Sequence, residues 1–267
     1  MAKTYCVVIR AHYIDEHVSA VVAEFNKLLG EDQFVVLDTD SVCQCSGLSN
    51  VLLYGSADIR RAGLLFDNNI FEYSKWYNGD YSLYIACRMI DRQYDDYWFI
   101  EYDVLLNFDD IRDFFDHFQE IDCDFISARF RKADKDWIWA NNLEWFSSDV
   151  YGSFFPVVRV SRRAINMLYY SRVLCGQQFV RLGLDRKCWP HAEAYCPTAL
   201  QKFGFDCADI NNFGKQFYTP DSLKGKRAGA HYTDDDRFGV ADSLIYHPVY
   251  DATQKKFCPV CRQLRNI

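Results

Sequence analysis

The segment from Tyr97 to Asp109 constrains the fold more than any other part of the chain. An apolar run over 97–100 ends at Glu101 and Asp103, and a second apolar run over 104–106 follows directly. A continuous hydrophobic run is typical of a buried central strand in an α/β sheet. Ligands of such sheets gather beyond the carboxyl ends of the strands. The sequence therefore predicts a buried strand whose tip places two acids at a binding site.

The spacing of these two acids suits a metal ion. One residue separates Glu101 from Asp103, so in an extended segment both side chains point to the same side. Mg²⁺ and Mn²⁺ are bound through one or two carboxylates together with substrate phosphates. The alternative is that Glu101 caps a turn and that Asp103 is a solvated acid. The flanking apolar runs favour the metal-binding interpretation.

The first forty residues predict a βαβ unit. Residues 5–11 form an apolar run, residues 18–29 have helical spacing and stop at Gly30, and residues 33–37 form a second run that leads into Asp38 and Asp40. An acid at the tip of the second strand of a nucleotide-binding fold often holds the ribose. Asp38 and Asp40 are therefore candidates for binding a nucleoside, with an ordinary loop role as the alternative.

The remaining chain alternates predicted helices and strands. The patterns predict helices over about 81–90, 109–118 and 162–170, a short strand after residue 51, and strands over 97–100, 123–127, 156–161 and 203–210. Residues 129–155 are rich in Trp and weakly periodic, which is typical of a functional loop, and we interpret them as the wall of an acceptor site. Pro190 is expected to begin a short helix whose first turn includes Glu193.

Composition narrows the class of protein. The 267 residues show no internal break, which favours one domain, and a net charge of -7 argues against nucleic acid as a partner. Aromatic residues make up 17% of the chain, which favours a sugar or nucleotide ligand but also fits a large core.

The odd count of 11 Cys and the absence of an apolar leader predict a reduced, cytoplasmic protein. Apolar runs fall short of the roughly 20 residues that span a bilayer, so at most peripheral membrane contact is expected.

A pair of cysteines near the C-terminus has the spacing of a zinc knuckle. Cys258 and Cys261 are separated by two residues, but no second pair or nearby His supplies the other ligands. We do not predict a zinc site from this pair alone.

Together these features resemble a nucleotide-sugar-dependent glycosyltransferase of the GT-A fold. The resemblance rests on the βαβ opening, the acids after the second strand, the acid triplet at 101–103, the aromatic segment and a late His. The stretch 98–104 is similar to one found in bacterial polysaccharide-type transferases. The resemblance runs from about residue 4 to 249 and is specific only at the triplet and its strand, where Glu101 replaces the usual Asp.

The resemblance implies an α/β fold with a mixed, mostly parallel sheet flanked by helices. It implies a single domain with a Rossmann-like nucleotide half over about 1–127, an acceptor half over about 128–250 and a tail over 251–267. The resemblance implies that Asp103 is the direct metal ligand and that His247 completes the metal shell. His231 is the substitute for His247 in this role. The alternative for His247 is a structural role, as a histidine hydrogen-bonded in a turn. The predicted set of nucleotide-binding residues is Arg10, Asp38, Asp40, Asp80 and Glu101.

The implied reaction moves a sugar from a nucleoside diphosphate sugar, with UDP as the expected nucleotide and Mn²⁺ or Mg²⁺ as the cofactor. The expected acceptor is a saccharide or glycolipid in surface polysaccharide synthesis, at a cytoplasmic site that extends to the inner face of the membrane. Basic side chains that could pair with the diphosphate are Arg60, Arg61, Lys224, Lys226 and Arg227, although a solvated surface role is the favoured interpretation for them.

Glu193 is the predicted general base because its neighbours are apolar and aromatic. Desolvation there would raise its pKa toward neutrality, whereas the helix N-terminus would lower it. Asp149 and Glu144 are the other candidates. A single carboxylate base implies inversion at the anomeric carbon, but a retaining enzyme could carry the same metal motif. Two alternative functions stay open. One is a sugar-nucleotide nucleotidyltransferase, which normally opens with a Gly-rich phosphate loop, whereas residues 9–15 of this chain contain no Gly. The other is a non-catalytic carbohydrate-binding protein.

Overall fold

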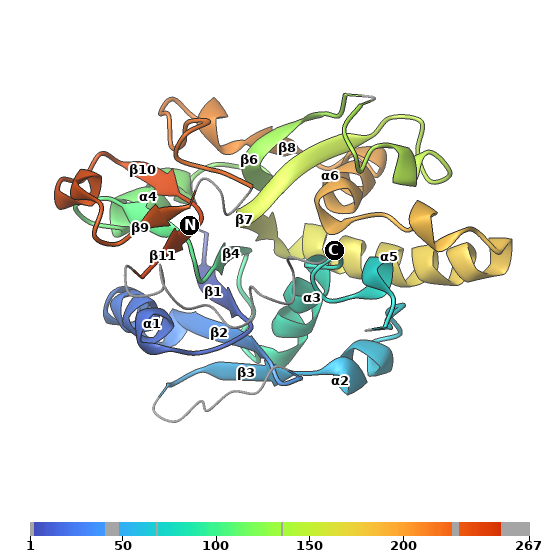
Figure 1. Cartoon of the computed structure of the whole chain (residues 1–267), viewed down its shortest axis with the longest axis horizontal. Coiled ribbons are helices and arrows are strands. Elements are labelled where there is room, and N and C mark those ends of the chain that lie inside the picture. The colour runs from blue at the N-terminus through green and yellow to red at the C-terminus, as the bar shows by residue number, and fades with distance from the viewer. Residues whose placement is uncertain (1–2, 41–47, 68, 135, 226–229, 252–267) are drawn as a thin grey trace.

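A seven-stranded sheet organises the chain (Figure 1). The computed structural model describes residues 3–40, 48–67, 69–134, 136–225 and 230–251. The sheet order is β3-β2-β1-β4-β7-β6-β8. The strands are β1 (Tyr5–Ala11), β2 (Gln33–Asp38), β3 (Val51–Tyr54), β4 (Asp96–Glu101), β6 (Phe125–Lys132), β7 (Tyr151–Ser161) and β8 (Cys207–Asp209).

One strand of this sheet runs against the others. β7 pairs antiparallel with both β4 and β6, whereas the other neighbouring pairs are parallel. The predicted mixed, mostly parallel sheet flanked by helices is therefore confirmed. β4 lies at the centre with five buried residues and ends at Glu101, so its carboxyl end opens at the sheet edge where ligands of such folds bind.

Helices cover both faces of the sheet and bury two hydrophobic cores (Figure 1). One core lies under α1 and α4, and the other lies under α2, α3, α5 and α6. The helices are α1 (Glu16–Leu29), α2 (Ser56–Arg61), α3 (Asp80–Met89), α4 (Arg112–Gln119), α5 (Arg162–Leu182) and α6 (Ala192–Lys202). Among the described helices, including the 21 residues of α5, none is long and apolar enough to cross a membrane.

Several predicted elements have different limits in the structure. α5 continues to Leu182 instead of ending at residue 170, because exposed Leu174, Val180 and Leu182 hide its amphipathic pattern. The predicted strand over 203–210 is reduced to the three residues of β8. The ends of the Trp-rich segment 129–155 belong to β6 and β7, which leaves residues 133–150 as the connection between them.

Two small sheets bring the end of the described chain back to the tip of β4. β5 (Leu105–Asn107) follows Asp103 directly and pairs antiparallel with β10 (Leu244–Tyr246). β9 (His231–Tyr232) pairs with β11 (Val249–Tyr250), and the backbone N–H of Val249 donates to the Asp103 carbonyl at 2.8 Å. His247, which lies between β10 and β11, is therefore fixed beside Asp103. The Cys258 and Cys261 pair lies outside the described residues, and the cysteines in the described ranges are free thiols.

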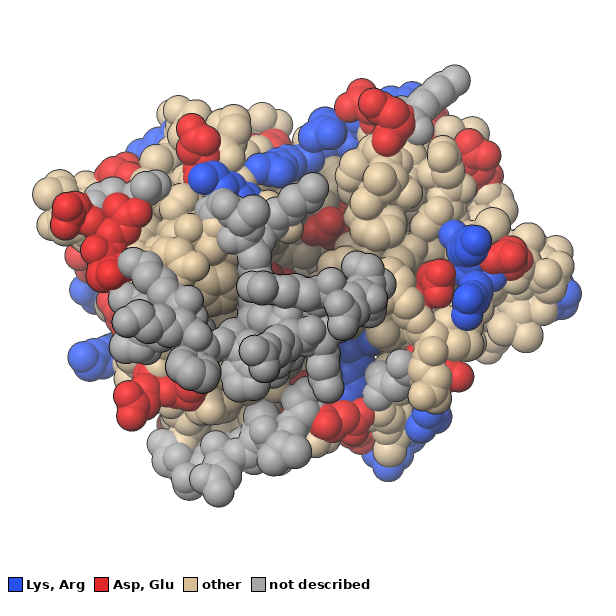
Figure 2. All heavy atoms as spheres, viewed as in Figure 1, with Lys and Arg blue, Asp and Glu red and all other residues tan. Residues whose placement is uncertain are grey.

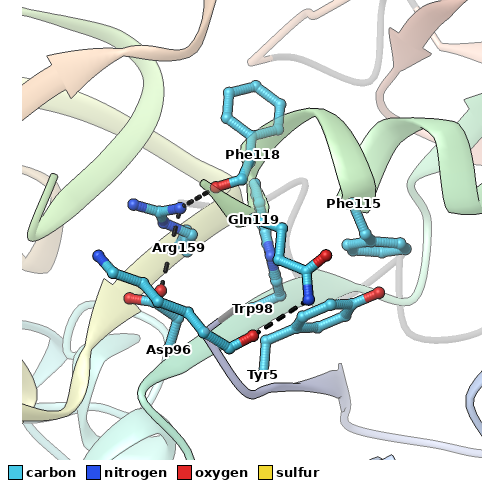
Figure 3. Close-up of a pocket in the computed structure, with 8 residues that line it drawn as sticks. Tyr5, Asp96, Trp98, Phe115, Phe118, Gln119 and Arg159 are labelled. Atoms are coloured by element: carbon cyan, nitrogen blue, oxygen red, sulfur yellow. Dashed lines mark hydrogen bonds and ion pairs between the residues drawn. The ribbon is translucent and has the colours of Figure 1, made fainter. Parts of the chain in front are cut away.

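The opposite end of β4 has a structural role (Figure 3). The guanidinium of Arg159, which is 1% exposed, donates to the carbonyls of Phe118 and Cys123 at 2.6 and 2.7 Å and lies 4.0 Å from Asp96. These carbonyls belong to the C-terminal end of α4 and the chain that follows it, where a cation is favourable. This cluster holds α4 on the sheet, far from the acids at the other end of the strand.

A second buried arginine joins α5 to two other elements. Arg172 is fully buried, and its Nε lies 3.1 Å from the carboxylate of Asp80 at the start of α3. The same guanidinium donates to Asn78 and to the carbonyl of Pro190 at 2.8 and 2.9 Å, and it faces the ring of Tyr195 at 4.1 Å. Because the Pro190 carbonyl lies just before α6, this arginine fixes the start of the helix that carries Glu193.

We expect Arg172→Met to lower the free energy of unfolding by about 3–5 kcal/mol, because it leaves the Asp80 carboxylate buried without its cation. Urea denaturation followed by circular dichroism measures the change. Arg131→Met is the matched control, because Arg131 and Asp134 form an exposed pair at 3.6 Å that contributes little. A cost no larger than that of the control would contradict the structural role of Arg172, and adding Asp80→Leu to Arg172→Met should recover part of the loss.

Candidate active site

Three ligand atoms converge at the tip of β4. Glu101, Asp103 and His247 each offer one atom, and these atoms lie within 4.8 Å of one another. The His247 Nε2 lies 3.3 Å from a Glu101 oxygen and 3.5 Å from the Asp103 Oδ1. Tyr102 between them is turned away and packs against Tyr13 at 4.9 Å. The two acids therefore point to the same side, as the spacing predicted.

The imidazole of His247 is oriented for metal binding. Its Nδ1 lies 2.9 Å from the Lys224 carbonyl and donates to it, so Nε2 is left to face the two acids. Metal-binding histidines usually donate their other ring N–H to a carbonyl or carboxylate in this way, which fixes the ring and its tautomer. His231 takes no part in this cluster, because its Nε2 lies 3.2 Å from the Ser222 carbonyl.

The charges within this cluster are strongly coupled. Burial raises the pKa of Asp103, and the neighbouring Glu101 charge raises it further. Burial would also raise the pKa of Glu101, but the Arg10 guanidinium and His247 outweigh it, and the pKa falls. Burial lowers the pKa of His247, whereas its contacts with the two acids reverse the sign and the pKa is raised. His247 therefore favours the charged form of both acids, but at Asp103 burial and the charge of Glu101 outweigh this effect.

The donor set fits a divalent cation. Asp103 Oδ1 is buried and makes no hydrogen bond within the described part of the chain, so it is a carboxylate oxygen with unused acceptor capacity. Two carboxylates and one imidazole suit Mn²⁺ better than Mg²⁺, which prefers oxygen ligands alone. Figure 2 shows that this face of the molecule is hollowed near its centre, with acidic atoms visible inside the hollow.

Arg10 adds a cation directly beside the acids. Its Nη2 donates to Glu101 at 2.8 Å, while its Nη1 is buried and has no hydrogen-bond partner among the described residues. A Cβ placed on Gly79 would lie 3.2 Å from Nη2, so the absence of a side chain there makes room for the guanidinium. A free guanidinium N–H beside a metal site is a suitable donor to a phosphate oxygen.

Asp38 and Asp40 lie together at the ends of β2 and β3. Lys75 bonds to both acids, at 2.8 Å for Asp40, and Ser56 also donates to Asp40. The hydrogen bond from Lys75 is the main cause of the lowered pKa of Asp40. Both acids are close to each other, but Lys75 already occupies oxygens that a ribose would need.

Asp80 is the predicted nucleotide residue whose placement argues against its expected role. It is fully buried, and its carboxylate accepts from Tyr84 at 2.8 Å as well as pairing with Arg172. Direct contact with a nucleotide would require this core ion pair to open. The Asn78-Gly79-Asp80 sequence looks like an exposed turn because the partner Arg172 lies 92 residues later.

Glu193 lies in the first turn of α6, where the charges of the acid cluster act on its carboxylate. Its carboxylate accepts from the Phe155 backbone N–H at 3.3 Å, and its side chain is 20% exposed. Burial raises the pKa of Glu193 to about 7, and the charges of Glu101, His247 and Arg10 also act on it. The predicted helix is present, but His191 caps it and Pro190 lies before the cap instead of starting the helix.

The other candidate bases and cations lie elsewhere. Asp149 pairs with Lys132 at 2.5 Å with both side chains exposed, and Glu144 is also exposed. Arg60 and Arg61 lie at the surface, where Arg61 pairs with Asp58 at 2.8 Å. Lys224 contributes its backbone carbonyl to His247. Lys226 and Arg227 lie outside the described residues.

Sequence reasoning did not single out four residues that border the site. Lys75 binds Asp38 and Asp40, while Trp76 packs against His191, whose Nδ1 lies 4.0 Å from the Glu193 carboxylate. Arg129 has φ 57° within an irregular part of β6, and its guanidinium lies 5.1 Å from the ring of Phe154, which packs on His247. A non-glycine residue at positive φ often marks a functional site, but the sequence does not reveal it.

No protein-family model and no curated protein sequence matches the chain. Among solved structures it is similar to mouse xyloside xylosyltransferase 1 in its apo form, with 12% identity over 91% of this chain and 97% of that chain and a TM-score of 0.47. It is similar to an active-site mutant of LgtC, with 10% identity, coverage of 92% and 86% and a TM-score of 0.42. It is also similar to glucosyl-3-phosphoglycerate synthase from Mycobacterium tuberculosis in complex with Mg²⁺ and uridine diphosphate, with 13% identity, coverage of 69% and 67% and a TM-score of 0.35. These likenesses are weak, so the function proposed below rests on the geometry of the site itself.

Proposed function

We propose that this protein is a metal-dependent glycosyltransferase that uses a nucleoside diphosphate sugar. The observation that carries the proposal is the convergence of Glu101, Asp103 and His247 at the carboxyl end of the central strand, where one Asp103 oxygen has no hydrogen-bond partner among the described residues. Arg10 lies beside these acids with an N–H that bonds to no residue in the described ranges, so the same place offers ligands for a cation and a donor for a phosphate.

Each residue of the site would have its own role in glycosyl transfer. Asp103, His247 and Glu101 would hold Mn²⁺, which when bound offsets the negative charge of the departing diphosphate. Arg10 would donate to a phosphate oxygen, and Asp38 and Asp40 would contact the nucleoside after sharing or releasing Lys75. Glu193 would accept the proton of the acceptor hydroxyl, for which a pKa of about 7 is well suited.

The finer assignments are part of the same proposal. We propose UDP as the nucleotide, a saccharide or glycolipid hydroxyl as the acceptor, and a role in surface polysaccharide synthesis at the cytoplasmic side of the membrane. One carboxylate base at the acceptor side supports direct displacement with inversion. The stereochemistry of the product, followed by proton NMR of the anomeric signal, tests that assignment separately.

Isothermal titration of UDP into the protein with and without Mn²⁺ tests the proposal. We expect binding with Mn²⁺ to be at least about a hundredfold tighter than in EDTA, because the two acids repel the diphosphate unless a cation lies between them. GDP and ADP under the same conditions serve as controls for the base. Metal-independent binding of UDP, or no binding of any of the three nucleotides, would contradict the proposed function.

A further inference from the structure

The segment 71–79 contacts three different parts of the site. Lys75 bonds to Asp38 and Asp40, and Gly79 packs against the Arg10 guanidinium. Between these two positions, the ring of Trp76 lies 5.4 Å from the ring of His191. The segment therefore passes from the acids after β2 to the start of α6, so Trp76 lies on the Glu193 side of the site.

Trp76 presents an exposed aromatic surface at this position. Trp76 is 65% exposed and Phe71 is 49% exposed, and their rings stack with centroids 5.5 Å apart at 29°. Covering the exposed faces of such a stacked pair with a ligand or partner is favourable, because it removes apolar surface from water. The flat faces of such rings match the apolar C–H face of a pyranose.

A short path connects this aromatic pair to the candidate base. Trp139 stacks on His191 with ring centroids 4.4 Å apart and an angle of 7°, so His191 lies among Trp76, Trp139 and Tyr77. The Nδ1 of His191 lies 4.0 Å from the Glu193 carboxylate. Only one imidazole therefore separates the exposed indole from the carboxylate that would take the acceptor proton.

His191 also has an unused hydrogen-bond donor. Its Nδ1 accepts from the Glu193 backbone N–H at 3.2 Å, so the proton of the neutral ring is on Nε2. Nε2 is buried and has no hydrogen-bond partner among the described residues. Leaving a buried donor unsatisfied is unfavourable, and a sugar hydroxyl that reaches past the exposed Trp76 ring would satisfy it.

We propose that Phe71 and Trp76 form the binding platform for the acceptor, which is a pyranoside stacked on Trp76 with a hydroxyl directed to Glu193. This inference rests on the proposed function and identifies the acceptor as a sugar ring. The neighbouring Lys75 turns toward Asp38 and Asp40 while Trp76 turns toward His191. The platform therefore serves the acceptor and not the nucleoside.

Saturation-transfer-difference NMR with the intact protein, UDP and Mn²⁺ tests this assignment. The probes are the methyl α- and β-pyranosides of glucose, galactose and xylose. We expect at least one of them to bind and Trp76→Ala to weaken that binding about tenfold or more, because the stacking contact is lost. Trp76→Phe keeps a ring and should recover most of the affinity. Tyr170→Ala, at a 64% exposed aromatic residue on α5, is the control and should leave binding unchanged.

Parallel titration of UDP with Mn²⁺ separates this inference from the proposed function. Normal UDP binding in Trp76→Ala together with weakened pyranoside binding supports the platform. Weakened UDP binding in Trp76→Ala with unchanged pyranoside binding would overturn it, because Trp76 would then serve the nucleoside. Tight UDP binding by the unaltered protein with no bound pyranoside would also overturn it, while the proposed function would stand.

Discussion

Asp103→Ala is expected to lower the kcat/KM for release of UDP from a UDP-sugar by about a thousandfold, a loss of about 4 kcal/mol of transition-state stabilisation. Transfer to water is the reaction to measure, because it needs no known acceptor. The expected size follows from the position of Asp103. It is the buried acid whose Oδ1 has no hydrogen-bond partner among the described residues, so its removal takes away a ligand atom, while Glu101 remains as a partner for His247.

The same variant should keep its stability. Burial raises the pKa of Asp103, so in the metal-free protein its charged form is unfavourable. We expect the Tm of Asp103→Ala without metal to be equal to or above that of the unaltered protein. Asp109→Ala, at an exposed acid six residues later, should change neither activity nor Tm. A variant at Asp103 that keeps Mn²⁺-dependent UDP binding would refute the metal-ligand role.

The first elements of the chain, β1, α1, β2 and the central β4, were predictable because local signals agree there. The apolar runs of β1, β2 and β4 are buried on both faces, so their patterns are continuous. α1 begins after Asp15, which accepts from the Val18 N–H at 2.8 Å, and it ends at Gly30 with φ 55°. Capping and periodicity together fix such an element without knowledge of the rest of the fold.

The placement of His247 could not be derived from its own surroundings. Its position depends on the pairing of β10 with β5, which joins residues almost 140 positions apart. The resemblance alone suggested it. Lys75 and Arg172 were missed for a related reason, because a basic residue in a polar sequence looks like a solvated one until the distant acid that it pairs with is known. The burial of Asp80 was missed for the same reason, because Arg172 is its partner in that ion pair.

The desolvated surroundings of Glu193 could be predicted because the sequence itself shows apolar neighbours on both sides. Trp189, Ala192, Ala194 and Tyr195 are all buried, and their packing desolvates the carboxylate between them. The sequence could not give the size of the effect, because the helix N-terminus opposes burial. In the structure burial outweighs the hydrogen bond from the Phe155 N–H and the nearby cations, and the pKa of Glu193 rises to about 7.

Glu193→Gln is expected to lower kcat for sugar transfer by about a hundredfold to ten-thousandfold, since the amide cannot accept the acceptor proton. Because the carboxylate is the active form, kcat/KM of the unaltered enzyme should rise with pH up to about 7 and then level off. The variant should lose this dependence. Initial rates from pH 5 to 9 measure both effects, and Glu144→Gln, at an exposed acid, is the matched control. A variant with an unchanged profile would exclude Glu193 as the base.

The Glu193→Gln variant should lose activity but gain stability above neutral pH. The pKa of Glu193 in the folded state, about 7, lies above its ordinary value of 4.5, so its charged form disfavours folding. The neutral carboxyl group of Glu193 contributes fully to the free energy of unfolding below about pH 4.5, and this contribution is lost as the pH rises through about 7. Glutamine keeps a neutral side chain at every pH. At pH 8 we therefore expect Glu193→Gln to be more stable than the unaltered protein, by up to about 3 kcal/mol in urea denaturation, with the gain disappearing toward pH 4.5. An equal gain at both pH values would show that packing, and not the charge of a buried base, causes the change.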